Sequence, residues 1–251
     1  MDFCFVIGHY ARDPEHRVAL HHCVQSIRDV YGKDAKIHVI DDHSPIPLEW
    51  KGDDPNLQVH LNPWPRSGEV GVLYWYLHNA ALAPESYAYC LHDSMICRKA
   101  VRPSSSCMLW SFDRAYGYHH SEIARLLHVI RHPRGDFEAW WRVFLEQAMQ
   151  TWMGCFGLAC FVARKDLQQL QDQHGFFDAM VLISTREDRQ AMERIFGMFL
   201  CHTLRPMGSL CGSIFAHPDM ANPRLGRLSY EEKQAAFPEY AYPFFKTWYG
   251  R

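Results

Sequence analysis

The segment Tyr87-Ala-Tyr-Cys-Leu-His-Asp-Ser-Met-Ile96 decides how the rest of the chain is interpreted. A mostly apolar run of this length between helical segments is typical of a central parallel strand with helices on both faces. The apolar run ends abruptly in His92, Asp93 and Ser94. In open α/β sheets, ligands bind in the crevice beyond the carboxyl ends of the strands. The three polar residues therefore indicate either a ligand site or an ordinary turn, where Asp and Ser bond their own backbone.

Upstream of this strand, the chain has the pattern of a β-α-β unit. Phe3–Ile7 is an apolar run, a helix is expected over residues 14–30, and Lys36–Ile40 predicts a second strand. A right-handed crossover makes the two strands parallel, so their carboxyl ends face one crevice. Asp41 and Asp42 follow the second strand and are expected to accept hydrogen bonds from a ribose or a base, or else to serve as turn residues.

A loop rich in proline and glycine follows the third predicted strand, Asn56–His60. Gly68 and Gly71 in this loop allow a ligand to approach the backbone closely, and Glu69 lies between them. The next helix, expected over 72–82, is apolar nearly all round and should be buried under the sheet. The first loop has no glycine-rich dinucleotide or phosphate-loop motif, which disfavours those two ligand classes.

The second half of the chain continues with helical and extended segments. We expect helices over 120–132, 136–151, 164–171 and from about 184 to 200, a glycine-containing strand over 152–162, and a last strand or extended segment over 208–215. Thr185, followed three residues later by Asp188, predicts a capping box at the start of the last of these helices. The aromatic stripe of the second helix is typical of a core.

Composition limits the class of protein. The 251 residues are 48% hydrophobic and 22% charged, with a net charge of -2, so the chain can bury a large core. No basic stripe favours nucleic acid, and no apolar run reaches the roughly 20 residues that span a bilayer. Nine scattered cysteines without paired spacing favour reduced thiols. We therefore expect a soluble, cytoplasmic protein with no transmembrane segment and no nucleic-acid partner.

In this order and spacing, the elements resemble GT-A-type glycosyltransferases, the nucleotide-sugar-dependent fold, and small glycosyltransferase domains of large DNA viruses and bacteria in particular. The features that carry the resemblance are the acids Asp41-Asp42, the strand end His92-Asp93-Ser94 where that family has a D-x-D motif, the glycine segment 154–157, and the acidic helix start Glu187-Asp188. The resemblance implies a mixed, mostly parallel α/β sheet with helices on both faces. It also implies a domain over 1–220, with a nucleotide-binding half at 1–100, an acceptor-binding half at 101–220, and a tail at 221–251 packed on the domain.

The resemblance also implies roles for particular residues. The nucleotide-sugar donor, with UDP as the expected nucleotide, would be bound by Gly8, His9, Tyr10, Arg12, Asp41, Asp42, Arg66, Gly68, Glu69, His92, Asp93 and Ser94. The sugar or the glycan or glycoconjugate acceptor would be bound by Trp152, Gly154, Cys155, Phe156 and Gly157. An inverting reaction needs a carboxylate that deprotonates the acceptor hydroxyl, and this base would be Asp188, with Glu187 as second choice.

The D-x-D motif is reduced here to a single carboxylate, that of Asp93, which leaves two possibilities for the diphosphate. In the first, Mn²⁺ or Mg²⁺ is held by Asp93, His92 and His217. In the second, the site is metal-independent, and Arg12, Arg66, Arg98 or Lys99 neutralises the diphosphate. The same reduction also fits a different class of protein, a binding or accessory protein that has lost turnover. In addition, Asp188 has an alternative role as a helix cap, with the following residues, including Glu193, on a solvated helix face.

Overall fold

The computed structural model describes residues 3–48, 50, 54–83, 86–112, 119–131, 137–145, 152–204, 208–216, 227–235 and 241–247. Its main sheet has six strands in the order β3-β2-β1-β4-β9-β6. They are β1 (Phe3–His9), β2 (Ile37–Asp41), β3 (Leu57–Leu61), β4 (Tyr87–His92), β6 (Cys107–Met108) and β9 (Cys160–Ala163). The first four are parallel to one another, and β9 is antiparallel to both β4 and β6. The predicted mixed, mostly parallel sheet is confirmed.

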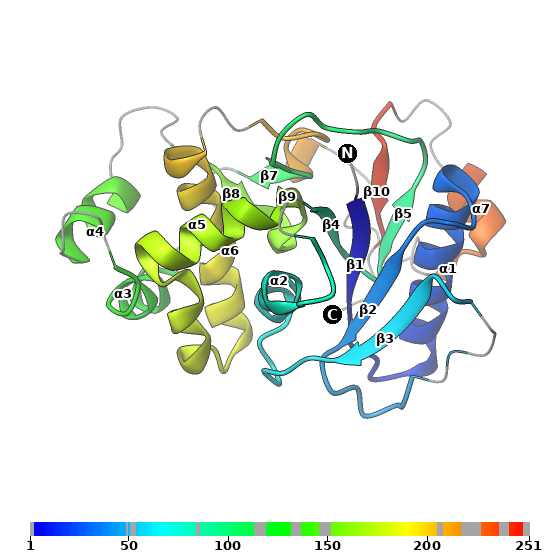
Figure 1. Cartoon of the computed structure of the whole chain (residues 1–251), viewed down its shortest axis with the longest axis horizontal. Coiled ribbons are helices and arrows are strands. Elements are labelled where there is room, and N and C mark those ends of the chain that lie inside the picture. Colours follow the sequence, from blue (N-terminus) through cyan, green and yellow to red (C-terminus); the bar gives the residue numbers. More distant parts are fainter. Residues whose placement is uncertain are drawn as a thin grey trace.

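Helices cover both faces of the sheet (Figure 1). On one face, Ile27 of α1 (Pro14–Tyr31) shares a buried apolar cluster with Ile7 of β1. On the other, Leu73 of α2 (Glu69–His78) shares a second cluster with Val6 of β1. Successive β1 side chains point to opposite faces because a strand repeats every two residues. This double burial explains the nearly continuous apolar sequences of β1 and β4.

Four more helices pack on the same face of the sheet as α2, and this face holds the larger apolar cluster. They are α3 (His120–Leu127), α4 (Phe137–Leu145), α5 (Arg164–His174) and α6 (Arg186–Thr203). The expected helices are confirmed within the described residues, although α2 begins at Glu69, three residues before the start expected from its apolar run. In addition, α3 ends at Leu127, and residues 146–151 of the helix expected over 136–151 lie outside the described residues. Within the described ranges, the helices are too short or too polar to cross a bilayer.

The prediction of one continuous strand over 152–162 is wrong. The segment forms a two-residue strand β8 (Gly154–Cys155), a 3-10 turn η1 (Phe156–Leu158), and only then β9. Gly157 has a φ of 59°, in the left-handed region that favours glycine, and this interrupts the extended backbone. A Cβ atom at this position would lie 2.4 Å from Nε2 of His92. Glycine therefore lets the turn approach the end of β4.

The remaining short elements bring the end of the chain back to the centre. They are β5 (Met95–Cys97), β7 (Ser111–Phe112), the 3-10 turns η2 (Phe176–Leu182) and η3 (Ile214–Ala216), α7 (Tyr230–Ala235) and β10 (Phe244–Lys246). β10 is antiparallel to β5, with Lys246 opposite Met95, and Figure 1 shows the two strands side by side. The backbone N–H of Thr247 donates to the carbonyl oxygen of Ser94 at 2.8 Å. A residue near the end of the sequence is thereby fixed beside the end of β4.

Candidate functional site

The sheet has a topological switch point between β1 and β4. From β1 the chain continues to β2 and β3 on one side, and then crosses to β4 on the other side of β1. The loops after β1 and β4 therefore leave the sheet in opposite directions, and ligands in open α/β sheets bind in the crevice this creates. Gly8 of β1 is in register with His92 of β4, so both strands end at this crevice. The polar strand end noted in the sequence lies at this edge of the sheet.

His9 and Asp93 form a buried pair at the floor of the crevice. Nδ1 of His9 lies 2.8 Å from Oδ2 of Asp93, and the two residues are 2% and 0% exposed. The carboxylate accepts a hydrogen bond from the Nδ1–H group of the imidazole. Burial of an ionised carboxylate requires such a partner. The pair joins β1 to β4 and holds the floor rigid.

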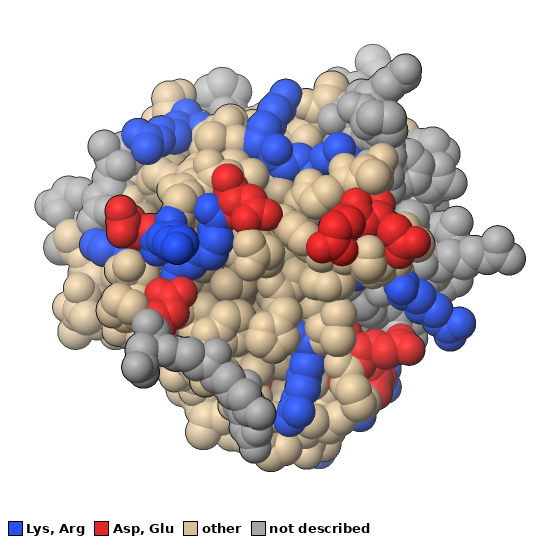
Figure 2. Space-filling model, turned by 90° about the vertical axis from the view of Figure 1, so that its right-hand side faces the viewer, with Lys and Arg blue, Asp and Glu red and all other residues tan. Residues whose placement is uncertain are grey.

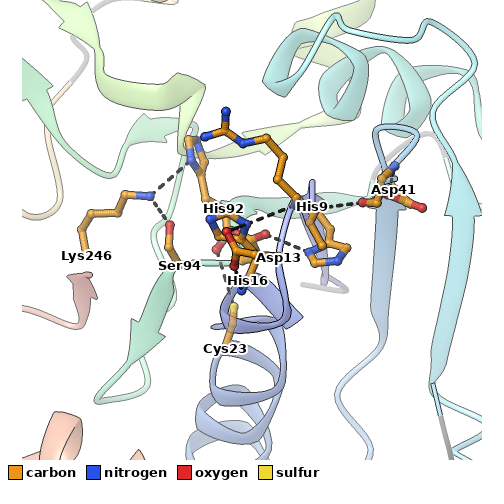
Figure 3. Close-up of polar contacts among 12 residues, drawn as sticks. His9, Asp13, His16, Cys23, Asp41, His92, Ser94 and Lys246 are labelled. Carbon is orange, nitrogen blue, oxygen red and sulfur yellow. Dashed lines mark hydrogen bonds and ion pairs between the residues drawn. The ribbon is translucent and has the colours of Figure 1, made fainter. Parts of the chain in front are cut away.

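His92 links three elements of the chain. Nε2 of His92 donates to the carbonyl oxygen of Gly157 at 2.6 Å, and its Nδ1 lies 3.4 Å from Nζ of Lys246. Burial and the adjacent ammonium of Lys246 lower the pKa of His92 to about 4. His92 is therefore neutral at pH 7 and accepts from the lysine through Nδ1. Figure 3 shows Lys246 extending toward both His92 and Ser94, to whose hydroxyl it donates a hydrogen bond.

Charged side chains from α2 and α6 surround the same point. Oε1 of Glu69 lies 3.7 Å from Nε2 of His92. Burial would raise the pKa of Glu69, but His92, Arg189 and Lys246 together hold it below its ordinary value. Glu193 accepts a hydrogen bond from the backbone of Gly157, and burial together with the charge of Glu69 raises its pKa to about 8. We use the name polar cage for the six residues Glu69, His92, Gly157, Arg189, Glu193 and Lys246.

Asp188 lies in the capping box of α6. Its Oδ2 accepts hydrogen bonds from the backbone N–H groups of Ser184 at 2.9 Å and Thr185 at 3.0 Å, while the Thr185 hydroxyl accepts from the backbone N–H of Asp188. Its Oδ1 pairs with Arg125 of α3, and the residue is 1% exposed. These contacts give Asp188 the capping role that the sequence left open. Glu187, one residue earlier, is exposed in the first turn.

Asp41 and Asp42 have different surroundings. Oδ1 of Asp41 accepts from the backbone N–H of Ser44, and Asp41 lines an open pocket of about 390 Å³ at the carboxyl ends of β2 and β3. Asp42 is turned toward the loop before α2, where its carboxylate accepts from Asn62, from the backbone N–H of Arg66 and from that of Gly68. Asp42 therefore shapes the loop, and Asp41 is the acid that borders open space.

The other predicted donor-binding residues surround the crevice. Gly8 and Tyr10 are half-buried at the end of β1, and a Cβ atom on Gly8 would lie 2.9 Å from Val72 of α2. Gly68 has a φ of 55° and lies against the side chain of Arg189. Arg12 and Arg66 are exposed on the surface. Gly8 and Gly68 thus serve close packing between elements.

The predicted acceptor-binding residues are mostly core residues. Trp152 is 2% exposed and stacks on Phe144, and Cys155 is 0% exposed. A Cβ atom on Gly154 would collide with the ring of Phe112, so this glycine accommodates an aromatic side chain and not a ligand. Phe156 is half-buried beside the apolar cluster of α1. Of this set, the structure brings only Gly157 into the polar cage.

Arg98 and Lys99 follow β5 away from the crevice. The guanidinium of Arg98 donates to the carbonyl oxygen of Gln234 in α7 at 3.0 Å. Two residues after Lys99, the Val101 carbonyl accepts from Tyr89, and the guanidinium of Arg102 lies over the ring of Phe3 at the first residue of β1. The segment therefore runs toward the opposite edge of the sheet, which removes both cations from the predicted diphosphate site.

The residues around His92 do not fit a divalent metal ion. With its Nε2 donating to Gly157, His92 has a lone pair only on Nδ1, and that atom faces the ammonium of Lys246. Asp93 is committed to His9, and His217 lies outside the described residues. In the part of the chain that the structure describes, no three His, Cys, Asp or Glu residues are grouped to hold a metal ion. The positive charge in this place comes from Lys246 and Arg189.

Sequence reasoning missed Lys246, Arg189 and Glu193. Lys246 lies in a tail with no pattern that points to the strand it joins, and only its pairing with β5 brings it to Ser94. One alternative from the sequence placed Glu193 on a solvated face of α6, and that alternative is wrong because η1 and α2 pack against α6. One signal in the sequence was usable: Gly157 lies in the only glycine pair of an otherwise apolar segment, which is typical of a close backbone approach.

Comparisons with known proteins identify no family. No protein-family model and no curated protein matches the sequence. Among solved structures, one that resembles it is the galactosyltransferase LgtC, in complex with donor and acceptor sugar analogs. The two share 10% identity with a TM-score of 0.40, and the match covers 78% of this chain and 70% of that one. A likeness at this level carries no argument, so any assignment of function has to rest on the sheet topology and the polar cage.

Proposed function

We propose that this protein is a glycosyltransferase that moves a sugar from a nucleoside-diphosphate sugar, with UDP as the nucleotide, to a hydroxyl of a glycan or glycoconjugate. The observation that carries the proposal is the convergence of Lys246, His92 and Glu193 around Gly157 at the switch point of a mostly parallel sheet. Sugar transfer needs a cation for the departing diphosphate and a carboxyl group for the attacking hydroxyl. The polar cage contains both kinds of group.

Lys246 is the cation that would neutralise the diphosphate. It is 8% exposed, and its ammonium is oriented by Ser94 and by the neutral His92. An ammonium held in this way acts as a fixed point charge for phosphate oxygens without a metal ion. We therefore propose a metal-independent site.

The pocket beside Asp41 suits the nucleoside. Its volume of about 390 Å³ falls within the range of small-molecule sites. His43, Ser44 and His60 add polar groups to the Asp41 carboxylate, while Pro47 and Leu48 add apolar surface for a base. The pocket lies at the ends of β2 and β3, and β2 is next to β1 in the sheet. A donor bound here would direct its diphosphate along the carboxyl edge toward the polar cage.

The charge on the face shown in Figure 2 gives no reason to invoke nucleic acid as a substrate. On the face shown in Figure 2, Lys and Arg side chains are interspersed with Asp and Glu side chains, and the basic ones form no continuous stripe. Nucleic-acid binding relies on such a stripe, because phosphate contacts supply most of the affinity.

A thermal-shift titration with UDP, GDP and dTDP, each with EDTA or with Mn²⁺, tests the binding step. We expect UDP to raise the Tm with EDTA present as much as with Mn²⁺. The catalytic step is tested by release of UDP from UDP-glucose and UDP-galactose. Stabilisation by UDP without release from either sugar would instead favour the accessory protein that has lost turnover. No response to any of the three nucleotides would refute the proposed function.

Lys246→Met is the matched test of the cation. Loss of a charge-assisted hydrogen bond costs about 1.5–3 kcal/mol, so we expect UDP to bind roughly 10- to 100-fold more weakly. Lys246→Arg keeps the charge and should retain part of the affinity. The control is Lys165→Met, because Lys165 is exposed on α5 and its loss should leave binding unchanged. Equal affinities of Lys246→Met and the control would exclude Lys246 from the diphosphate site.

A further inference from the structure

We infer that Glu193 is the base that removes the proton from the acceptor hydroxyl, an inference that rests on the proposed sugar transfer. Glu193 lies on α6, two turns beyond the helix start to which the base was assigned from the sequence. The residue is half-buried. Its carboxyl group is held by the backbone of Gly157, whose carbonyl oxygen holds His92. The backbone of one residue therefore fixes the base relative to the imidazole that orients Lys246.

This arrangement supplies the two groups that displacement at the anomeric carbon needs: Glu193 as the base for the attacking hydroxyl and Lys246 as the cation for the leaving diphosphate. The acceptor oxygen forms a bond to the anomeric carbon of the sugar, while the bond from that carbon to the diphosphate oxygen breaks. The electron pair of the broken bond leaves with the diphosphate, beside Lys246. The hydroxyl proton passes to the Glu193 carboxylate, which later releases it to water. The step balances with the donor and the acceptor alone: the nucleoside diphosphate leaves with one additional negative charge, and the acceptor hydroxyl gives up one proton.

The groups that face Glu193 come from four elements. They are Glu69 of α2, Cys155 of β8, Arg194 of α6 and Lys246 of β10. Burial and the negative charge of Glu69 raise the pKa of Glu193 to about 8, against the lowering effects of Arg194, the Gly157 backbone and Lys246. A carboxyl group with a pKa near the working pH is a stronger base than an ordinary glutamate and still deprotonates in solution.

Asp188 is not suited to the same task. Its carboxylate is occupied by two backbone N–H groups and Arg125, and although burial opposes them these hydrogen bonds lower its pKa. A carboxylate stabilised in its ionised form by several donors is a weak base. Among the described residues of α6, Glu193 is the carboxylate directed at the η1 turn and the end of β4.

Glu193→Gln tests the inference in the full-length protein. Glutamine has the shape and neutrality of the protonated carboxyl, so we expect the Tm and the UDP affinity to stay within error of the wild type. Release of UDP from UDP-glucose or UDP-galactose should fall about 100-fold or more, as general-base catalysis predicts. Asp172→Asn is the matched control, because Asp172 is exposed on α5 and its loss should leave the rate unchanged.

The pH profile separates a base from a residue that only shapes the site. The wild-type rate should rise between pH 6 and pH 9 with an apparent pKa near the value of about 8 for Glu193, and Glu193→Gln should abolish this rise. Glu193→Asp should recover part of the rate and keep a rising limb. Turnover by Glu193→Gln at the wild-type rate, or a retained limb, would overturn the inference while leaving the proposed function intact. A wild type that neither binds UDP nor releases it from its sugars would overturn both.

Discussion

Replacing Asp188 gives the clearest separation between a capping role and a catalytic role. Asp188→Ala removes the acceptor of the Ser184 and Thr185 backbone N–H groups, and loss of a helix cap costs about 0.5–2 kcal/mol. The pair with Arg125 adds less than about 1 kcal/mol, because exposed partners are screened and the Arg125 side chain is 45% exposed. We therefore expect a loss of about 2 kcal/mol, or a fall in Tm of roughly 4–8 °C for a chain of this length.

The assay is urea unfolding of the wild type, Asp188→Ala and Asp188→Asn, followed by circular dichroism at pH 7 and at a series of pH values below 4. Asparagine keeps one acceptor oxygen, so its loss should lie between zero and that of alanine. Backbone hydrogen bonds, acting against burial, lower the folded-state pKa of Asp188. The stabilisation by ionised Asp188 is therefore present above its unfolded-state pKa of about 4. It is lost as the pH falls through the folded-state pKa. The difference between wild type and Asp188→Asn should shrink toward low pH.

One result would contradict the capping role of Asp188. If Asp188→Asn unfolds with the free energy of the wild type at pH 7 and yet releases no UDP from UDP-sugars, the capping argument is refuted and the base returns to the start of α6. A graded loss of stability with retained release supports the capping role.

The geometry makes three further predictions. Gly157→Ala should lower the free energy of unfolding by at least about 1–2 kcal/mol and weaken UDP binding. The reason is that residue 157 has a φ of 59° and that its Cβ would lie 2.4 Å from Nε2 of His92. Urea unfolding measures the first effect and a UDP titration the second. Chelation with EDTA should leave UDP release unchanged in a coupled phosphate assay, because Lys246 and not a metal ion supplies the positive charge. Burial lowers the pKa of His38 to about 4 and also lowers the pKa of His60. The free energy of unfolding should therefore fall as the pH drops below about 6.5, the unfolded-state pKa of histidine. The double variant His38→Gln/His60→Gln should lose less free energy of unfolding between pH 7 and pH 5 than the wild type.

The local elements can be predicted from the sequence because their causes are local. Pro14 begins α1, and Thr185 with Asp188 makes the predicted capping box of α6. The apolar run of β4 required cover on both faces, and helices provide it. The failure at 152–162 has an equally local cause: the left-handed conformation of Gly157 ends a strand that composition alone would continue.

The sequence by itself determined the order of strands β1 to β4 and helices α1 to α6, the sheet edge at which polar strand ends gather, and the acids at the ends of β2 and β4. These features depend on periodicity and turn chemistry within a few residues. Only the tertiary structure decided which side chains share the crevice, because Glu69, Gly157, Glu193 and Lys246 are far apart in the sequence. It placed Asp188 in a cap, Glu193 against Gly157, and Lys246 beside the imidazole of His92. Within segment 87–96, His92 and Ser94 orient Lys246, which the last strand, β10, supplies. No pattern within either segment encodes that contact.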